Sequence, residues 1–194
     1  IHCFKYCLKI LQKIIFRLSS RSNKGQTMSS GSVQNINTWL TQIHNDFKSA
    51  VSVDCVIFGY DDDALKVLVS KCDMPPFEHE YSLLGDLVHP DETTDEAAKR
   101  VLMAKTGFTD VYLEQVQVFS DLNRHPLGRV ITVAYFSLIK IDEDHLAHLE
   151  KNASLQWIPV KEISTLAFDH YDIMHTCHKK MQKQITKDIL QWDV

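Results

Sequence analysis

Several patterns that would assign this chain to a class at once are missing from its sequence. The five cysteines form no CxxC pair, and only Cys3 and Cys7 lie close together, so neither a zinc site nor a disulfide framework is indicated. No HExxH motif accompanies the ten histidines, and we expect no histidine metal site. Without disulfides, a reducing cytoplasmic location is the default expectation.

Long apolar runs and internal repeats are also missing. No run approaches the roughly 18 apolar residues that a membrane-spanning helix needs, and no repeat or low-complexity segment is visible. What is present is a chain of 194 residues, 44% of them hydrophobic, which is enough to bury one core. Length and composition therefore favour one domain with extensions.

Charge is unevenly distributed along the chain. Residues 1–27 hold six lysines and arginines and no acid, so a formal net charge of −10 falls on residues 28–194 out of −4 for the whole chain. A nucleic-acid-binding face needs clustered Lys and Arg to displace phosphate counterions, and an acidic body does not offer one. We therefore expect no nucleic-acid binding by this chain.

The first 27 residues need a separate interpretation. Lys5, Lys9, Lys13 and Arg17 fall every four positions among apolar residues, which is typical of a basic amphipathic helix and is compatible with an anionic membrane surface. The interpretation that we favour is that Met28 is a natural start and that residues 1–27 are a non-native extension, so that no membrane partner is expected. Residues 28–49 would then be a linker with a short helix at 36–48.

The remainder of the chain alternates strand-like and helix-like patterns, which predicts an α/β domain. The first two strands are joined by a short acidic turn and should form a hairpin. A long terminal helix is predicted with Asp169 as its N-cap. The predicted strands are 50–59, 65–70, 81–84, 111–119, 130–139 and 155–159, and the predicted helices are 94–106, 160–166 and 169–190.

The helix at 94–106 carries the clearest local signals. Thr93 or Thr94 can act as its N-cap, acids occupy the first turn where the helix dipole favours them, and Gly107 stands at the C′ position. Alanine, valine and leucine recur at helical spacing, so one face should dock on a sheet.

This helix and the loop before it resemble the Nudix box. Gly85, Glu92, Arg100 and Gly107 match the box's opening glycine, loop glutamate, arginine and closing glycine. In the family, three helix glutamates hold Mg²⁺ or Mn²⁺ against a pyrophosphate, and their positions are occupied here by Val101, Ala104 and Lys105. The box is therefore expected to be degenerate, with neither a metal nor any other cofactor.

The resemblance extends over residues 50–185 and implies an α/β/α sandwich with a mixed sheet. Arg124-x-Pro126-x-x-Arg129 and residues 166–170 (LAFDH) look like Nudix-related transcriptional regulators, and residues 97–102 (AAKRVL) resemble their sugar-responsive, arabinose-regulator-like branch in Bacteroidetes. In that branch a winged helix follows the Nudix domain. We accordingly expect a Nudix domain at 50–168 and a terminal helix at 169–194, truncated before the winged helix.

The family also implies a ligand pocket between the box loop and the loop before residue 130. Arg124 and Arg129 could clamp a phosphate or sugar hydroxyls, and Tyr135 or Phe168 could stack on a ring. The alternatives are a surface ion pair for Arg129, a core position for Tyr135 and a simple helix cap for Asp169. The candidate ligand-binding residues are Asp54, Leu84, Gly85, Asp121, Asn123, Arg124, Arg129, Tyr135 and Phe168.

Two functions follow from these patterns. The first is a catalytically inactive ligand-sensing domain of the transcriptional-regulator type, which binds a sugar or an ADP-ribose-like nucleoside diphosphate sugar and for which a homodimer is possible. The alternative is a Mg²⁺-dependent Nudix hydrolase, in which Glu92, Asp95, Glu96 or Glu114 would rebuild the metal site. A third interpretation is a non-functional remnant.

Overall fold

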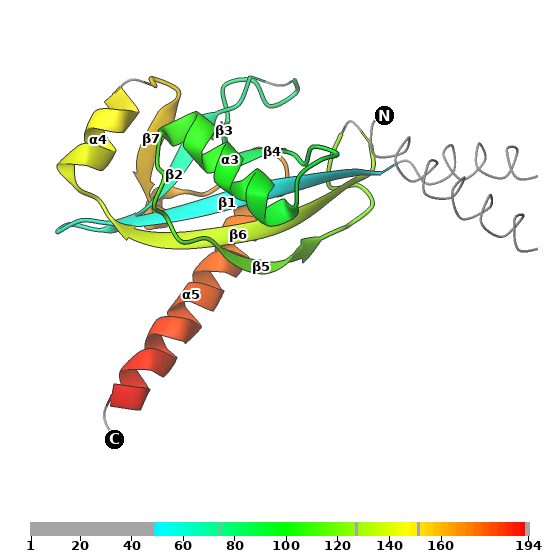
Figure 1. Ribbon diagram of the computed structural model, residues 1–194. Coiled ribbons are helices and arrows are strands. Elements are labelled where there is room, and N and C mark those ends of the chain that lie inside the picture. Colours follow the sequence, from blue (N-terminus) through cyan, green and yellow to red (C-terminus); the bar gives the residue numbers. More distant parts are fainter. Residues whose placement is uncertain (1–48, 74, 127, 151, 193–194) are drawn as a thin grey trace, which may run out of the picture. The chain divides into compact units, whose positions relative to one another are not determined.

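The computed structural model describes residues 49–192 except positions 74, 127 and 151 (Figure 1). The expectations for residues 1–27, for the helix at 36–48 and for the last two residues lie outside the described residues. The account below concerns the compact unit formed by residues 50–88 and 92–194. No helix in the described part of the chain is long and apolar enough to cross a membrane.

The strands form one seven-stranded mixed sheet, which confirms the predicted α/β fold class. Its order is β3-β2-β1-β6-β5, with β4 added beside β1 and β7 beside β2. The β1–β6 pairing is parallel and the others are antiparallel. The strands are β1 (Ala50–Tyr60), β2 (Leu65–Lys71), β3 (Tyr81–Ser82), β4 (Leu84–Leu87), β5 (Glu114–Phe119), β6 (Val130–Lys140) and β7 (Leu155–Pro159).

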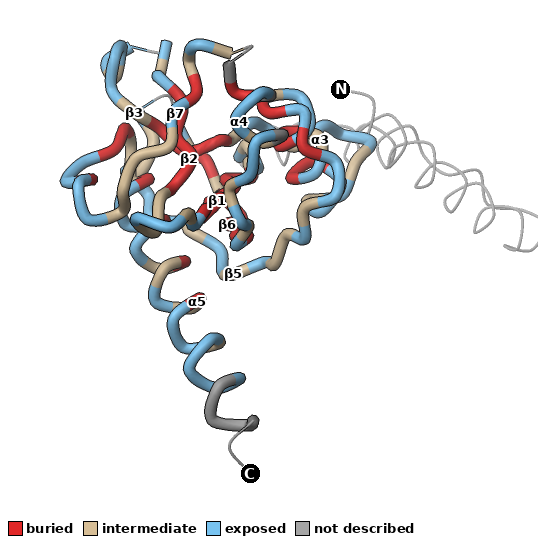
Figure 2. Tube along the Cα trace, turned by 90° about the vertical axis from the view of Figure 1, so that its left-hand side faces the viewer, coloured by how far each residue is buried: buried red, intermediate tan, exposed pale blue. Residues whose placement is uncertain are grey.

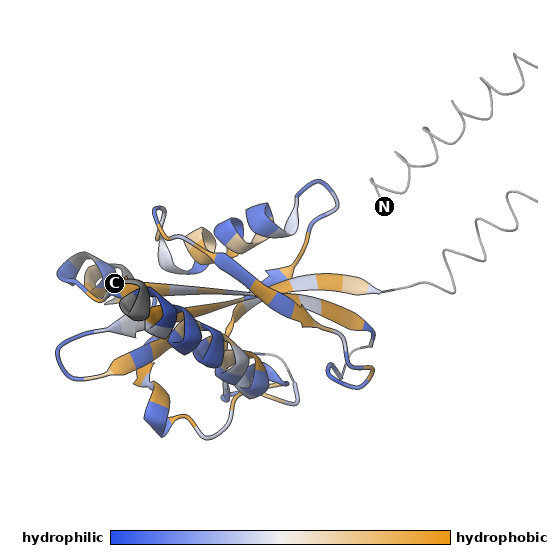
Figure 3. Cartoon of the chain, turned by 90° about the horizontal axis from the view of Figure 1, so that it is seen from below, coloured by the Kyte–Doolittle hydropathy of each residue, from blue (hydrophilic) through white to orange (hydrophobic). Residues whose placement is uncertain are grey.

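Helices lie on both faces of the sheet, so the predicted α/β/α layering is also present. Helix α3 (Thr94–Thr106) covers one face and α5 (His170–Trp192) begins against the other, as Figure 1 shows in green and red. The structure also contains α4 (Glu143–Glu150) and the 3₁₀ turn η1 (Val160–Glu162). Hydrophilic residues predominate along α5 (Figure 3), and among its described side chains the buried hydrophobic ones, from Ile173 to Met181, lie in its first half.

The alternation along β1 separates two hydrophobic clusters. Val53, Cys55 and Ile57 pack with α3, whereas Val56 and Phe58 pack with α5, because successive strand residues point to opposite faces. Figure 2 shows the resulting burial through the centre of the sheet. The α5-side positions continue towards the start of β1 as Asp54 and Ser52, so the apolar face ends there in polar groups.

Three predicted elements differ from the structure. The strand expected at 81–84 is divided into β3 and β4, because Ser82 pairs with β2 whereas Leu84 pairs with β1. The strand expected at 111–119 begins only at Glu114, and the helix expected at 160–166 is the single turn η1. Helix α4 was not predicted. Asp142 precedes it and accepts a hydrogen bond from the His145 N–H over 2.9 Å.

Candidate ligand-binding site

A cavity of about 450 Å³ opens where the edge of β1 changes partner. Residues 58–60 of β1 pair with β2, whereas residues 52–55 pair with β4, and the sheet is split between these segments. Strands β1, β4 and β6, the end of β2, the end of α3 and the segments before β6 and α5 all contribute to the lining. The volume is within the range of about 300–1,000 Å³ that is typical of small-molecule sites.

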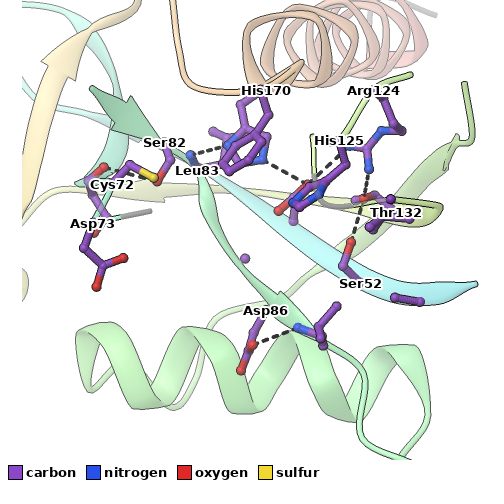
Figure 4. A pocket seen from close by; sticks show the side chains of 18 of the residues that line it. Ser52, Cys72, Asp73, Ser82, Leu83, Asp86, Arg124, His125, Thr132 and His170 are labelled. Carbon is purple, nitrogen blue, oxygen red and sulfur yellow. Dashed lines mark hydrogen bonds and ion pairs between the residues drawn. The ribbon is translucent and has the colours of Figure 1, made fainter. Parts of the chain in front are cut away.

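Arg124 forms the centre of a buried polar network in this cavity (Figure 4). Its side chain is 4% exposed, and its Nε and Nη2 donate to the two carboxylate oxygens of Asp169, each over 2.7 Å. Its Nη1 donates to Thr132 Oγ1, which also lies 2.6 Å from Ser52 Oγ. The guanidinium is therefore engaged with protein groups, and its expected contact with a phosphate or with sugar hydroxyls stays a prediction.

His170 extends the network to β1 and β4. The Leu83 N–H donates to His170 Nδ1 over 3.0 Å, so Nδ1 is an acceptor and the ring proton is on Nε2. Nε2 lies 3.5 Å from Asp54 Oδ2, and the same oxygen lies 4.0 Å from Arg124 Nη2. Leu83 donates its N–H to His170 at the point where the chain passes from β3, which pairs with β2, to β4, which pairs with β1.

Gly85 permits a close approach between β4 and β1. A Cβ at this position would lie 2.0 Å from Asp54 Oδ1 and 2.9 Å from the Val53 carbonyl oxygen. No real side chain tolerates such distances, so the Asp54 carboxylate lies over Gly85 only because glycine has no Cβ. The opening glycine of the box thus shapes the wall of the cavity.

Aromatic rings line the cavity beside Arg124. The Phe168 and His125 rings are stacked, with centroids 4.9 Å apart and planes 7° from parallel, and Phe77 lies 4.5 Å from Phe168 on a tilted plane. Phe168 adopts a left-handed φ of 58°, which the neighbouring backbone holds through a hydrogen bond from the Ala167 N–H to the Tyr81 carbonyl. Burial, followed by the nearby Arg124 and His170, lowers the pKa of His125, which favours a neutral ring that can stack.

Basic groups line the same cavity. Lys71 comes from the end of β2, Lys105 from the last turn of α3 and Arg129 from the residue before β6. Arg129 donates to the carbonyls of Ser120 and Asp121 and so meets no opposite charge there. In the described residues, no hydrogen bond or ion pair involves the ammonium groups of Lys71 and Lys105.

The other side chains of the box hold the loop and helix in place. Arg100 donates to both carboxylate oxygens of Glu92, to Asp86 and to the Leu87 carbonyl, and these carboxylates raise its pKa. Burial alone would raise the pKa of Asp86, but the hydrogen bond from Arg100 outweighs burial and leaves the pKa lowered. Thr93 is the N-cap and forms a capping box with Glu96.

The nine predicted ligand-binding residues are only partly brought together. Asp54, Gly85, Arg124, Arg129 and Phe168 line the cavity. Leu84 is fully buried in the α3-side cluster, away from the lining. Tyr135 also faces α3, where its hydroxyl bonds to Thr94 and Asp95 and where burial, followed by the hydrogen bond to Asp95, raises its pKa to about 12. Asp121 and Asn123 are exposed in the loop before β6 and lie outside the lining.

Sequence reasoning did not assign several lining residues to the pocket. Ser52 and Thr132 interrupt two otherwise apolar strands, and this pattern could have indicated a polar end of the sheet. Lys71 and His125 carried no signal of their own, and His170 belonged to the 166–170 segment of the family resemblance and adjoined the expected helix cap without being assigned to the pocket.

The cavity, the split sheet and the loop–helix segment of the box together match a known family. The NUDIX domain model covers residues 48–177. The chain belongs to the Nudix family. It is 30% identical over 147 residues to the ADPR responsive transcriptional repressor NtrR of Acinetobacter baylyi, a match that covers 72% of this chain and 58% of that protein.

Two further relatives show how varied this Nudix group is. The ADP-ribose pyrophosphatase of Methanocaldococcus jannaschii is 26% identical over 143 residues, which cover 74% of each protein. The crystal structure of Shewanella oneidensis NrtR is 26% identical, with a TM-score of 0.64, and the match covers 70% of this chain and 65% of that one. This Nudix chain thus spans less than two thirds of the length of either regulator.

Proposed function

We propose that this chain is a ligand-sensing Nudix domain of the transcriptional-regulator type, which binds a nucleoside diphosphate sugar of the ADP-ribose class and does not hydrolyse it. The cavity supports a ligand that has both a ring and negative charge, since its lining holds an aromatic stack and the basic residues Lys71, Lys105 and Arg129. The similarity to an ADPR responsive repressor favours this ligand class over a free pentose, which the arabinose-regulator resemblance suggested.

The presence of Lys105 on the cavity wall is the observation that carries the proposal. In the Nudix pattern this position holds a glutamate that binds the metal, whereas an ammonium group repels a divalent cation. The other two glutamate positions are the buried Val101 and the exposed Ala104, neither of which offers an oxygen ligand. Among the described residues, no group of three or more His, Cys, Asp or Glu could hold a metal ion. The residues present do not fit Mg²⁺.

The hydrolase alternative draws support from the similarity to an ADP-ribose pyrophosphatase. It would require acids from outside the usual helix positions, and each candidate is already engaged. Glu92 accepts from Arg100, Asp95 from Tyr135, Glu96 from the Thr93 cap and Glu114 from Lys180 and Gln184. Rebuilding a metal site would break these contacts, so we propose no hydrolysis.

Calorimetric titration of the full chain with ADP-ribose and with arabinose tests the proposal. We expect binding of ADP-ribose, and Phe168→Leu should weaken it about tenfold, since ring stacking contributes roughly 1–3 kcal/mol per base. Tyr112→Leu is the matched control, because Tyr112 is 78% exposed and lies outside the cavity.

A product assay separates sensing from hydrolysis. Incubation of the chain with ADP-ribose and Mg²⁺ should release neither AMP nor ribose 5-phosphate. If the wild type releases both products and Glu92→Gln does not, the chain is a hydrolase instead. If the titration shows binding of arabinose and not of ADP-ribose, the effector is a sugar. The expected cytoplasmic location, the possible homodimer and the lack of nucleic-acid binding remain predictions.

A further inference from the structure

Lys71 and Lys105 are 34 positions apart in the sequence, but the backbones of both are hydrogen-bonded to the same turn, at residues 152–154. The Lys71 N–H donates to the Ser154 carbonyl over 2.9 Å, and Asn152 Nδ2 donates to the Lys105 carbonyl over 3.2 Å. Asn152 Oδ1 in turn accepts from the Ser154 N–H and hydroxyl. The turn at 152–154 therefore ties the end of β2 to the end of α3, and both lysines are among the residues that line the same hollow.

Acidic residues of the cavity offset the charge of these lysines only in part. Of the three acids in its lining, Asp54 faces Arg124 and His170, and Asp86 is bonded to Arg100 over 2.9 Å. Asp73 is the third, Asp86 also interacts with Lys105 through its charge, and Glu78 lines the adjoining hollow beside both lysines. The cavity lining itself holds four basic residues, Lys71, Lys105, Arg124 and Arg129, against these three aspartates. A cavity with this balance attracts an anion, and it does so in a chain whose overall charge is negative.

Lys105 occupies a metal-binding position of the Nudix box pattern, which relates the two lysines to the place where that pattern binds its metal. Lys105 stands where the box pattern has a metal-binding glutamate, and it is one of the residues that line the cavity. Lysine binds phosphate as a compact point charge with three donors. Figure 4 shows Cys72 and Asp73, which follow Lys71 in the sequence, on one side of the cavity and Arg124 and His125 on the other.

We propose that Lys71 and Lys105 form a metal-independent diphosphate site, in which two ammonium groups take the place of the divalent cation. This inference rests on the proposed function and specifies how the diphosphate of the ligand is held. Binding of ADP-ribose then requires no Mg²⁺, weakens with salt because exposed charges are screened, and depends on the diphosphate rather than on the nucleoside.

Titrations of ADP-ribose, inorganic pyrophosphate and adenosine, each in EDTA and in Mg²⁺, test the pair. We expect equal ADP-ribose affinity in both buffers. Lys105→Gln and Lys71→Gln should each weaken ADP-ribose and pyrophosphate binding about tenfold to a hundredfold, as expected for a lost charged hydrogen bond, and leave adenosine unchanged. Lys105→Arg keeps the positive charge and should retain most of the wild-type affinity for ADP-ribose and pyrophosphate.

Lys99→Gln is the matched control, since it removes the same charge from an exposed position on α3 outside the cavity. Thermal unfolding of each variant checks that the fold persists. Two results would overturn the lysine site while leaving the sensor proposal in place. One is ADP-ribose binding that requires Mg²⁺, and the other is an equal effect of Lys105→Gln and Lys99→Gln on that binding. A wild-type chain that binds no ADP-ribose in either buffer would instead overturn the proposed function.

Discussion

Arg124 and Asp169 form a two-pronged ion pair that fastens the start of α5 to the cavity. The two bonds are 2.7 Å long and join residues 45 positions apart, from the loop before β6 to the residue that precedes α5. The same guanidinium also bonds to Thr132 in the wall of the cavity. Arg124 therefore connects the start of the terminal helix to that wall.

Removal of the carboxylate from this pair should destabilise the fold strongly. Asp169→Ala leaves a guanidinium with 4% exposure uncompensated, and we expect a loss of about 3 kcal/mol in the free energy of unfolding, measured by urea titration. Asp61→Ala is the control. It breaks the Lys66–Asp61 pair beside the β1–β2 hairpin, where the lysine left behind can reach water, so the loss should be much smaller. Equal losses would contradict the buried role of Arg124.

Gly85→Ala should be destabilising for a steric reason alone. The new Cβ would overlap Asp54 Oδ1 and approach the Val53 carbonyl to 2.9 Å, and a strand carbonyl cannot move aside without disturbing the sheet. We expect a loss of about 2 kcal/mol in unfolding free energy, typical of overpacking, together with weaker ADP-ribose binding. Chemical denaturation and calorimetry measure the two effects. Wild-type stability in this variant would show that β4 can shift away from β1.

Glu92→Gln distinguishes a structural glutamate from a metal ligand. Glu92 accepts a paired contact from Arg100 and its side chain is 13% exposed, so its neutralisation should lower the unfolding free energy by about 1.5 kcal/mol. Ligand affinity should not change, with or without Mg²⁺.

Glu96→Gln is the matched substitution for this test. It makes the same charge change in the first turn of α3, just after the loop that holds Glu92, and glutamine can keep the capping box. A Mg²⁺-dependent affinity that disappears in Glu92→Gln but persists in Glu96→Gln would assign a metal to Glu92.

Local signals explain why α3 could be predicted from the sequence. Thr93 caps its start through contacts within three residues, and Gly107 ends it with φ 78° and a hydrogen bond to the Met103 carbonyl. The Val- and Ile-rich composition of residues 50–59 likewise predicted a buried strand. Such features depend on neighbours in the sequence, and a single sequence displays them.

The site was harder to predict because it depends on partners far away in the sequence. Asp169 has the local pattern of an N-cap, yet both of its oxygens accept from Arg124. Tyr135 and Leu84 lie on the α3 side of the sheet because of strand register, and a shift of one residue would have turned them to the opposite face. Lys71 enters the cavity only because the turn at 152–154 holds β2 beside α3.

The stacked His125 should make stability depend on pH just below neutrality. Its pKa in the folded protein is lowered by burial and by Arg124, so the unfolded chain takes up the proton first as pH falls below about 6.5. The stability that neutral His125 contributes is therefore fully present above about pH 6.5 and is lost as the pH falls through the pKa of His125 in the folded protein. Asp86, Glu96 and Glu114 also have lowered pKa values, but as carboxylates they act below about pH 4.5.

Urea titrations of the wild type and of His125→Gln between pH 7.5 and about pH 5.5 isolate this histidine from the carboxylates. The wild type should lose stability over this interval, and the variant should lose less. His178, whose pKa is lowered by burial and then by His175, contributes with the same sign, so His178→Gln is the necessary comparison. The two substitutions should flatten the profile additively, because the histidines contact different rings, Phe168 and Phe58. A profile that only His178→Gln flattens would mean that the His125 stack tolerates the proton, and the neutral ring assigned to the cavity would be wrong.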